Sequence, residues 1–337
     1  MAETVWHEAT EFEIEGRGWA DTASPYDRFP ARAKGIVPQH VWGLSRHSAG
    51  LCVRFQTDAP KIEVRWSLIS DSLAMPHMPA TGVSGVDLYA RQPDRTWRYV
   101  QTGVPSAQDG NTTEALTGAD AGLREYLLYL PLYNGAKRVE IGVPSGSRVE
   151  SSAPRPAATA RPIVVYGTSI VQGGCASRPG LAWTSILGRK LDRPVINLGF
   201  SGSGRMEPEV VGVIAELDPA VFVIDALWNL NGEEEAEVTK RVKALVRVLR
   251  GAHPQTPILL VGQSLIYTER HPMPMTRWQE KAVRDLRREG LTGLHTASGA
   301  NLMGKDTEGT VDGVHPNDIG MMRQADALAP VLRRLVR

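Results

Sequence analysis

The sequence predicts two structural parts in one chain, an all-β region followed by an α/β domain. In the first part, apolar residues alternate with polar ones, which is the period of a strand with one buried face. In the second part, short continuous apolar runs alternate with amphipathic helical stretches, which is typical of a parallel sheet covered by helices. A length of 337 residues also fits two domains better than one. We therefore expect a β-sandwich or jelly roll over residues 1–150, a linker over 151–162 and an α/β domain over 163–337.

The alternation of the first part is clearest in KIEVRW, where Ile62, Val64 and Trp66 fall on one face. Similar runs occur at 51–55, 97–99 and 139–143, separated by segments that contain Gly, Pro, Asp and Asn. Several short strands without long helical patterns between them indicate a sandwich or jelly roll. The following segment, SSAPRPAATARP, has no apolar period, so we expect an extended connection there.

The second part contains apolar runs that are long enough for strands and are followed by helical patterns. The stripe of Val238, Val242, Leu245, Val246 and Leu249 indicates one amphipathic helix within 233–250. Strand–helix alternation predicts right-handed crossovers and a three-layer α/β fold. The expected strands are 163–166, 194–200, 220–227 and 257–262, with a shorter one near 291–296, and the other expected helices are 183–191, 209–217, 277–289 and 319–336.

Composition excludes several classes of function. Lysine plus arginine number 38 and aspartate plus glutamate 37, so a net charge of +1 offers no general attraction for nucleic acid or an anionic membrane. The two cysteines, Cys52 and Cys175, give neither a disulfide framework nor a zinc spacing. The N-terminus lacks the basic start and apolar run of a signal peptide, and no window is apolar enough to cross a bilayer. We expect no nucleic-acid or membrane partner and a cytoplasmic location, or a secreted or periplasmic one if a signal peptide has been removed.

A serine follows the first expected strand of the α/β domain. In an open parallel sheet, ligands bind at the carboxyl ends of the strands, and Ser169 lies there in the sequence GTSI. At the start of a helix its backbone N–H is placed to stabilise a developing oxyanion. The alternative is that Ser169 only caps the following helix, which is the more common role of a lone serine in such a turn. As a nucleophile it would need a base.

The sequence DGVHP before the last expected helix supplies a candidate base. Asp312 and His315 are three residues apart, so the carboxylate can reach the imidazole Nδ1 atom. The aspartate would then fix the tautomer of the ring and support the imidazolium that forms when Nε2 takes a proton. The alternative is an ordinary helix start with an exposed histidine.

The loops after the second and third expected strands offer hydrogen-bond donors. Gly202 lets a backbone N–H approach a substrate, and the side chain of Asn229 can donate a second hydrogen bond. Asn231 lies two residues further and is the alternative to Asn229. Both loops can equally be ordinary turns, since Gly and Asn are common turn residues. Trp228 can stack on a sugar ring or close the core.

In this order, the four blocks resemble those of the SGNH hydrolases, also called the GDSL family of esterases and lipases. GTSI stands where the family has GDSL, NLGFSGSG matches the glycine block and DGVHP matches the last block, whereas DALWN lacks the usual Gly-x-Asn-Asp. The resemblance covers about 162–337 and implies a flavodoxin-like three-layer domain. It also implies that Ser169 is the nucleophile, His315 the base and Asp312 its orienting partner. Ser169, Gly202 and Asn229 would form the oxyanion hole, with no metal and no cofactor.

The first part adds a second resemblance. GVDLYAR at 85–91 and LSRHSAG at 44–50 look like segments of a two-domain group of SGNH esterases that carry an N-terminal jelly roll. That group is linked mainly with the removal of acetyl groups from sugars, which implies a small-molecule or oligosaccharide ester as substrate. Trp228, Gln263, His271, Arg46 and His47 are candidate substrate-binding residues, although a solvated surface loop is the more common role of a segment such as 45–48.

Two further residues of the loop after 263, Tyr267 and Glu269, belong with these candidates, and we expect the run 271–275 to form a flexible rim. His77 lies between Met75 and Met78, but no further ligand nearby supports a metal site.

The sequence thus predicts a serine esterase for short acyl esters, with two alternatives. One is an acyltransferase that uses the same site, and the other is a glycan-binding protein with a vestigial catalytic domain. A Gly-x-Ser-x-Gly elbow, a P-loop and a zinc-binding HExxH helix are absent from the sequence, which disfavours other hydrolase classes. The sequence predicts neither the natural ester nor the oligomeric state.

Overall fold

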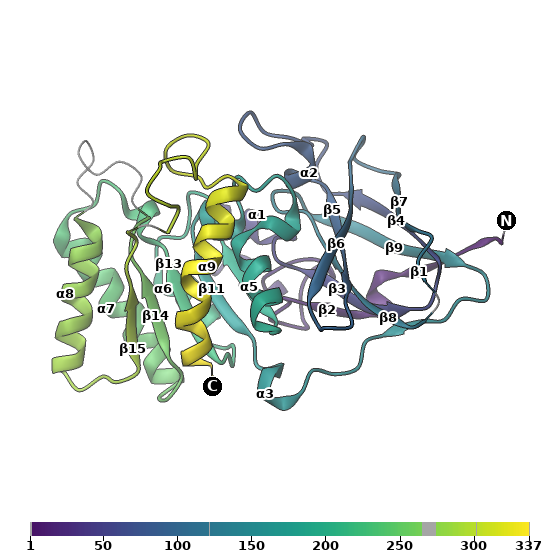
Figure 1. Ribbon diagram of the computed structural model, residues 1–337. Helices are drawn as coiled ribbons and strands as arrows, with labels where there is room; N and C mark the ends of the chain where they lie inside the picture. The colour runs from purple at the N-terminus through teal and green to yellow at the C-terminus, as the bar shows by residue number, and fades with distance from the viewer. Residues whose placement is uncertain (1, 121, 265–273, 301, 337) are drawn as a thin grey trace.

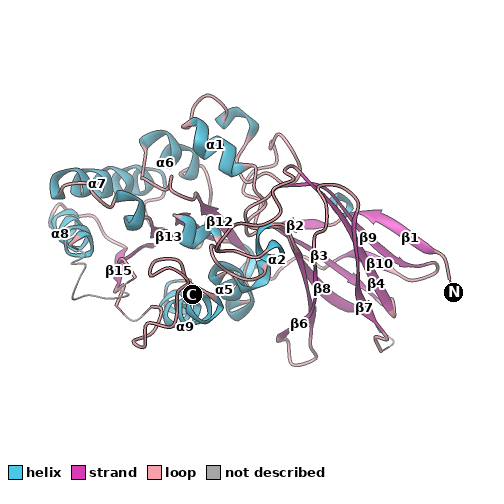
Figure 2. Cartoon of the chain, turned by 90° about the horizontal axis from the view of Figure 1, so that it is seen from above, coloured by secondary structure: helices cyan, strands magenta, loops and turns pink. Residues whose placement is uncertain are grey.

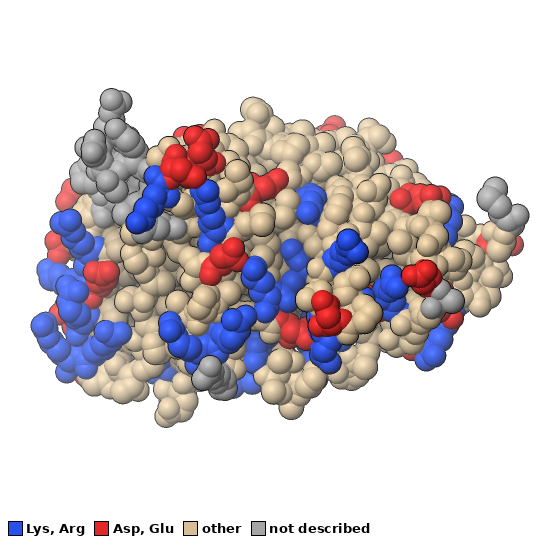
Figure 3. Space-filling view, viewed as in Figure 1, with Lys and Arg blue, Asp and Glu red and all other residues tan. Residues whose placement is uncertain are grey.

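The computed structural model describes the chain except residues 1, 121, 265–273, 301 and 337. Two antiparallel sheets form the N-terminal part, on the right in Figure 1, and a helix-covered parallel sheet forms the C-terminal part. None of the helices in the described ranges is both long and apolar enough to cross a membrane. Acidic and basic side chains lie interspersed on the face shown in Figure 3, in keeping with the small net charge.

The two antiparallel sheets bury one face each against the other, as the alternating sequence predicts. In β4 the residues of KIEVRWSL alternate between buried and more accessible, and Ile62, Val64 and Trp66 belong to the core between the sheets. One sheet has the strand order β1 (Thr4–Glu8), β9 (Ala136–Pro144), β4 (Lys61–Leu68) and β7 (Asn111–Thr117). The other has the order β10 (Val149–Ser151), β3 (Cys52–Thr57), β8 (Arg124–Tyr129), β5 (Val86–Arg91) and β6 (Trp97–Gly103), with β2 (Glu13–Glu15) paired to β3.

The five expected strands of the second part form one parallel sheet. Its order is β12 (Val195–Gly199), β11 (Ile163–Gly167), β13 (Val221–Asp225), β14 (Ile258–Val261) and β15 (Leu294–Ala297). In chain order this is 2-1-3-4-5, the flavodoxin-like order. The direction of winding reverses at β11, so the crevice for a ligand lies beyond its carboxyl end.

Helices cover both faces of the parallel sheet, as Figure 2 shows from above. One face packs against α6 (Pro208–Ile214), α7 (Glu235–Ala252) and α8 (Met275–Arg288). The other packs against α4 (Ser169–Gln172), α5 (Trp183–Leu191) and α9 (Asp318–Leu335). The connection between the two parts contains a short helix, α3 (Ala157–Ala160). The predicted three-layer α/β fold is confirmed.

Residues 17–46 do not continue the strand pattern of the first part. They form a 3-10 turn, η2 (Ala31–Ala33), and a helix, α1 (Gln39–Ser45), whose apolar side chains pack against the parallel sheet. The Phe29 ring lies 5.0 Å from the Phe200 ring, measured between centroids. The apolar residues of this segment do not alternate as in the strands of the first part, because most of them serve the core of the other domain.

The buried guanidinium of Arg28 holds this segment to the end of β12. Its Nε and Nη2 atoms donate to the carbonyl oxygens of His47 (2.8 Å) and Leu44 (2.6 Å). Its Nη1 atom donates to the carbonyl oxygens of Asn197 (3.1 Å) and Gly199 (2.7 Å). Burial lowers the pKa of Arg28 to about 9. One side chain thus satisfies four backbone acceptors from two parts of the chain.

We expect Arg28→Met to lower the free energy of unfolding by about 3 kcal/mol, because it leaves several buried carbonyl groups without donors. Denaturant unfolding at neutral pH measures the change. Arg148→Met is the matched control, since the Arg148 side chain is exposed and, within the described ranges, is paired with Glu150 alone. Equal unfolding midpoints for the two variants would contradict the stabilising role of the Arg28 hydrogen bonds.

Candidate active site

A hydrogen-bonded chain of Ser169, His315 and Asp312 lies at the carboxyl end of β11. The Ser169 Oγ atom is 2.8 Å from His315 Nε2, and His315 Nδ1 is 2.6 Å from Asp312 Oδ2. Asp312 Oδ1 accepts hydrogen bonds from the backbone N–H groups of Val314 (2.9 Å) and His315 (2.8 Å). The structure thus brings Ser169 to His315, which lies 146 positions further along the chain.

The competition between these contacts and burial sets the charge of Asp312. Partial burial raises the pKa of Asp312, but hydrogen bonds from the His315 backbone, the His315 ring and the Val314 N–H outweigh it and lower the pKa below its ordinary value. Asp312 is therefore ionised at neutral pH. An ionised acceptor at Nδ1 leaves the lone pair of His315 Nε2 directed at the serine hydroxyl.

The helix after β11 is capped by Thr168, which leaves the Ser169 side chain free to contact His315. Thr168 is the N-cap of α4, and its hydroxyl oxygen accepts from the Ile170 N–H at 3.3 Å. Ser169 is the first residue of that helix, and its side chain is turned to His315 instead. The alternative that Ser169 caps the helix is wrong, because the preceding residue does so.

The loop that carries Asp312 and His315 is closed upon itself. The Val311 N–H donates to the His315 carbonyl oxygen at 3.0 Å, and Thr310 and Pro316 form an antiparallel bridge. The helix α9 begins only at Asp318, with Asn317 as its N-cap. The Asp–His contact is therefore made within a tight loop rather than within the first turn of the helix.

Gly202 and Asn229 lie in neighbouring loops beyond β12 and β13. Gly202 has a φ of +68°, and a Cβ atom placed there would meet no other atom within 4 Å, so its backbone conformation is what favours glycine. Asn229 lies on η4 (Leu227–Leu230), and its Oδ1 atom accepts from the Gly204 N–H at 3.0 Å. This bond fixes the amide and leaves Nδ2 as its available donor. Asn231 is exposed at the end of η4, so the geometry favours Asn229 over Asn231.

The N-terminal part reaches the same edge through His47. Burial lowers the pKa of His47 to about 4, and the nearby Arg28 charge adds to the effect. Its Nδ1 atom is 3.1 Å from Gln172 Nε2, while Gln172 Oε1 accepts from the Ser201 N–H at 3.0 Å. The amide of Gln172 therefore donates to His47 Nδ1, and the ring is neutral with its hydrogen on Nε2.

Sequence reasoning missed Gln172 and Tyr133. Gln172 is fully buried, and it joins His47 to the loop that carries Gly202. The Tyr133 hydroxyl donates to the Ser169 carbonyl oxygen at 3.1 Å, and burial raises the pKa of Tyr133. Neither residue stands in a motif, and only the packing of the two parts shows their position.

The GVDLY segment, which carried the second resemblance, is an interdomain contact. The buried Asp87 carboxylate accepts from the Arg178 guanidinium at 2.8 Å and from the Gly180 N–H at 2.9 Å. Tyr89 packs so closely on Gly180 that a Cβ there would lie 2.3 Å from its ring. Its hydroxyl also accepts from Arg178 at 2.7 Å. The segment thus fixes η3 (Pro179–Leu181), which follows the candidate nucleophile in the chain.

The other candidate substrate-binding residues have separate surroundings. Arg46 forms an ion pair with Asp27, with 2.9 Å between Nε and Oδ1, and Gln263 is buried. Among the described residues, neither forms a hydrogen bond or an ion pair with Ser169 or His315. Trp228 is half-buried, and its Nε1 atom donates to Ser264 Oγ at 3.0 Å.

His271, Tyr267 and Glu269 lie outside the described residues. Of the expected rim 271–275, only Pro274 and Met275 are described, and Met275 begins α8 and is buried.

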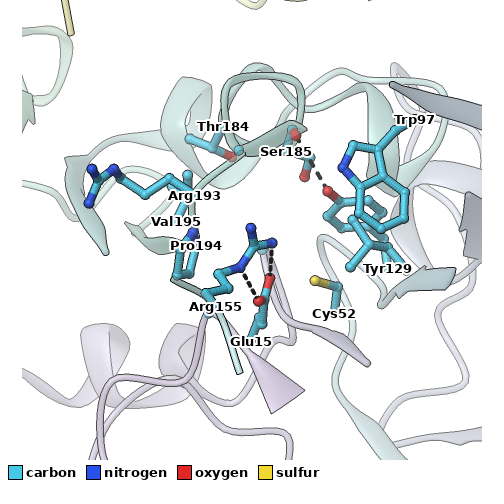
Figure 4. A pocket seen from close by; sticks show the side chains of 14 residues that line it. Glu15, Cys52, Trp97, Tyr129, Arg155, Thr184, Ser185, Arg193, Pro194 and Val195 are labelled. Atoms are coloured by element: carbon cyan, nitrogen blue, oxygen red, sulfur yellow. Dashed lines mark hydrogen bonds and ion pairs between the residues drawn. The ribbon is translucent and has the colours of Figure 1, made fainter. Parts of the chain in front are cut away.

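A small cavity of about 20 Å³ lies elsewhere, at the interface of the two parts (Figure 4). Glu15 and Arg155 form a buried ion pair on one side of it, and Trp97, Tyr129 and Ser185 lie on the other. None of the residues of the Ser–His–Asp chain lines it. Its size suits a single water molecule, so it belongs to the interface and not to the site.

Two protein-family models match the two parts of the chain. A model described as the GDSL-like lipase/acylhydrolase family matches residues 160–333, and one described as the N-terminus of SGNH-hydro-type esterases matches residues 4–149. Together with the fold, these matches define the class of protein, an ester hydrolase of the SGNH type. Within that class, the chain belongs to the GDSL-like lipase/acylhydrolase family. Among curated proteins, none matches the chain.

Solved structures share the whole two-part architecture. A protein from Bacteroides ovatus described as a GDSL-like lipase is 32% identical, with 99% of this chain and 98% of that chain covered and a TM-score of 0.87. The salicylyl-acyltransferase of a tetracycline biosynthetic pathway is 19% identical, with coverage of 100% and 99% and a TM-score of 0.80. A family two carbohydrate esterase from Cellvibrio japonicus is 14% identical, with coverage of 100% and 99% and a TM-score of 0.63. At such low identities, the last two are evidence for the fold alone.

The last residue of β13, Asp225, carries a buried carboxyl group. Burial raises the pKa of Asp225 to about 7, and the amide Nε2 of Gln324, 3.0 Å away, partly offsets it. Between the ordinary pKa of 3.8 and this value, the folded chain holds a proton that the unfolded chain has lost. The contribution of Asp225 to stability therefore falls as pH rises through that window.

We compare the free energy of unfolding of Asp225→Asn with that of wild type. We expect this difference to favour the variant by about 2 kcal/mol more at pH 8 than at pH 5. Denaturant unfolding of both proteins at the two pH values gives this difference, and other titrating groups cancel in the comparison. The interpretation fails if the variant differs from wild type by the same amount at both pH values.

Proposed function

We propose that this protein removes short acyl groups, most simply acetyl, from a carbohydrate or another small polar alcohol by way of an acyl-enzyme on Ser169. The observation that carries the proposal is the 2.8 Å contact between Ser169 Oγ and His315 Nε2, with Asp312 behind the ring. A serine becomes an effective nucleophile when a base lies within hydrogen-bond distance and a third group orients that base.

In the acylation step, the Ser169 oxygen attacks the ester carbonyl carbon while its proton moves to His315 Nε2. The imidazolium that results is stabilised by the ionised Asp312 at Nδ1. When the tetrahedral intermediate collapses, the bond to the alcohol oxygen breaks and His315 returns the proton to that oxygen. The alcohol leaves, and the acyl group stays on Ser169.

In the deacylation step, a water molecule takes the place of the alcohol. His315 Nε2 removes a proton from this water as its oxygen attacks the acyl carbon. Collapse of the second intermediate breaks the bond to Ser169 Oγ, which takes the proton back. The products are the carboxylic acid and the original enzyme, with no group left over.

The negative charge on the carbonyl oxygen needs donors in both steps. We assign this role to the N–H groups of Ser169 and Gly202 and to Nδ2 of Asn229. The bond from the Gly204 N–H to Asn229 Oδ1 supports the assignment, because it holds the amide with Nδ2 available. Donors fixed before the reaction stabilise the charge without reorganising, which is the main advantage of such a site.

We expect Ser169→Ala to lower kcat/KM for 4-nitrophenyl acetate by about 10³-fold or more while the unfolding midpoint stays near that of wild type. Ser145→Ala, an exposed serine of the N-terminal part, is the control and keeps wild-type turnover. The proposal is rejected if the Ser169 variant retains turnover comparable to that of the control.

Asn229→Ala should reduce kcat by about 10²-fold with a much smaller change in KM, because the lost donor acts mainly on the transition state. Asn231→Ala is the matched control two residues away and is expected to leave kcat unchanged. Steady-state kinetics on one acetate ester measures both variants. A larger loss of kcat for Asn231→Ala than for Asn229→Ala would show that Asn231, and not Asn229, supplies the donor.

An acyltransferase is the second candidate, and the likeness of the whole fold to a salicylyl-acyltransferase favours keeping it. Both reactions share the acyl-enzyme and differ in whether water or an alcohol accepts the acyl group. Product analysis in the presence of an added sugar or small alcohol separates them: free acid indicates hydrolysis, and a new ester indicates transfer.

A glycan-binding protein with a vestigial site is the third candidate. The hydrogen-bonded Ser169–His315 pair weighs against it. Failure of a fluorophosphonate to label Ser169 would favour it.

A further inference from the structure

The loop between β4 and α2 (Ala80–Val83) brings a second imidazole to the site. The ring centroid of His77 lies 5.7 Å from that of His315, with 57° between the ring planes. In Figure 1 the loop that enters α2 and the loop that enters α9 both lie along the upper edge of the molecule. His77 is exposed, and no described residue forms a hydrogen bond with its ring. A polar side chain of the N-terminal part thus stands beside the proposed base.

The backbone on either side of His77 is fixed by its neighbours. Met75 and Met78 exchange two backbone hydrogen bonds, of 3.0 and 3.1 Å, which close the turn. The Met78 side chain is only 1% exposed and packs in the core of the α/β domain with Cys175 and Ala176. Because both ends of the turn are held, the imidazole at its tip is presented in a defined place.

The same segment of the α/β domain holds both histidines. Thr81 Oγ1 donates to the Ser177 carbonyl oxygen at 2.6 Å, which ties the His77 loop to 175–177. The Cys175 N–H donates to the Pro316 carbonyl oxygen at 2.9 Å, which ties the His315 loop to it. The distance between the two rings is therefore set by one short stretch of backbone and not by a chance approach of two surface loops.

The environment of His315 excludes a shared metal ion. Both of its ring nitrogens are already engaged, Nε2 with Ser169 and Nδ1 with Asp312. The ligand that the proposed function offers to His77 is therefore the ester substrate, which passes beside the His315 ring. An imidazole with free nitrogens donates one hydrogen bond and accepts another, which suits a hydroxyl group.

The proposed chemistry decides which half of the ester passes there. The carbonyl oxygen is assigned to Gly202 and Asn229, whereas the alcohol oxygen must meet His315 Nε2 to receive its proton. The alcohol half therefore lies on the His315 side. We propose that His77 binds a hydroxyl group of this alcohol half, so that the enzyme favours esters of polyols such as sugars over esters of simple alcohols. This inference rests on the proposed function and adds a residue that determines specificity.

Three acetate esters test the role of His77: a methyl glycoside with one acetyl group, ethyl acetate and 4-nitrophenyl acetate. The first two have alkoxide leaving groups that need the proton of His315, but only the glycoside offers further hydroxyls. We expect His77→Ala to lower kcat/KM for the glycoside by about three- to tenfold, mainly through KM, and to leave the other two esters within twofold. His77→Gln, which keeps a donor and an acceptor, should restore part of the loss. His40→Ala, an exposed histidine on α1, is the control.

Three results would overturn the inference: an equal loss on all three esters, no loss on any, or a loss on the glycoside that glutamine does not relieve. An equal loss would mean that His77 acts on His315 or on the fold. If wild type hydrolyses none of the esters, or if Ser169→Ala retains the activity, the proposed function fails and the inference fails with it. Activity that depends on Ser169 but ignores His77 leaves the proposed function intact and removes only the inference.

Discussion

The position of the proposed base depends on how the chain from Gly173 to Leu181 is held. This stretch follows α4, the short helix that begins at Ser169, and it contains no strand that could fix it to a sheet. On one side, its Cys175 N–H and Ser177 hydroxyl bond to Pro316 and Asp318, which flank the His315 loop and open α9. On the other side, Arg178 and Gly180 bond to the buried Asp87 of the N-terminal part. Ser169 and His315 lie near opposite ends of the α/β domain's sequence, and this stretch of backbone fixes the distance between them.

Buried charge makes that arrangement specific. Burial raises the pKa of Asp87, and the Arg178 guanidinium and the Thr102 hydroxyl oppose the effect. The buried charge of Arg28 is stabilised by hydrogen bonds to four carbonyl oxygens instead of by a carboxylate. Such groups are costly to bury and are tolerated only when their hydrogen bonds are complete. They therefore define a single relative position of the two parts more strictly than apolar contact would.

The N-terminal part is thus a component of the site. It supplies His47 and, through Gln172, a contact to the loop that carries Gly202. It places Tyr133 on the carbonyl oxygen of Ser169 and His77 beside His315. Loops of the N-terminal part thus lie along one side of the candidate site, and we infer that this side sets which alcohols fit.

The sequence by itself determined the fold class and the local chemistry. Strand and helix periods are local properties, so the five parallel strands and the helices around them could be predicted within a few residues. Asp312 and His315 are three residues apart, so their contact is also nearly local. Only the tertiary structure decided that the Ser169 side chain turns to His315, that 17–46 packs on the α/β core, and that Asn229 bonds to Gly204. The contacts of Gln172, Tyr133 and His77 join residues far apart in the chain, and pairing of that kind depends on how the two parts dock, which no pattern within either part records.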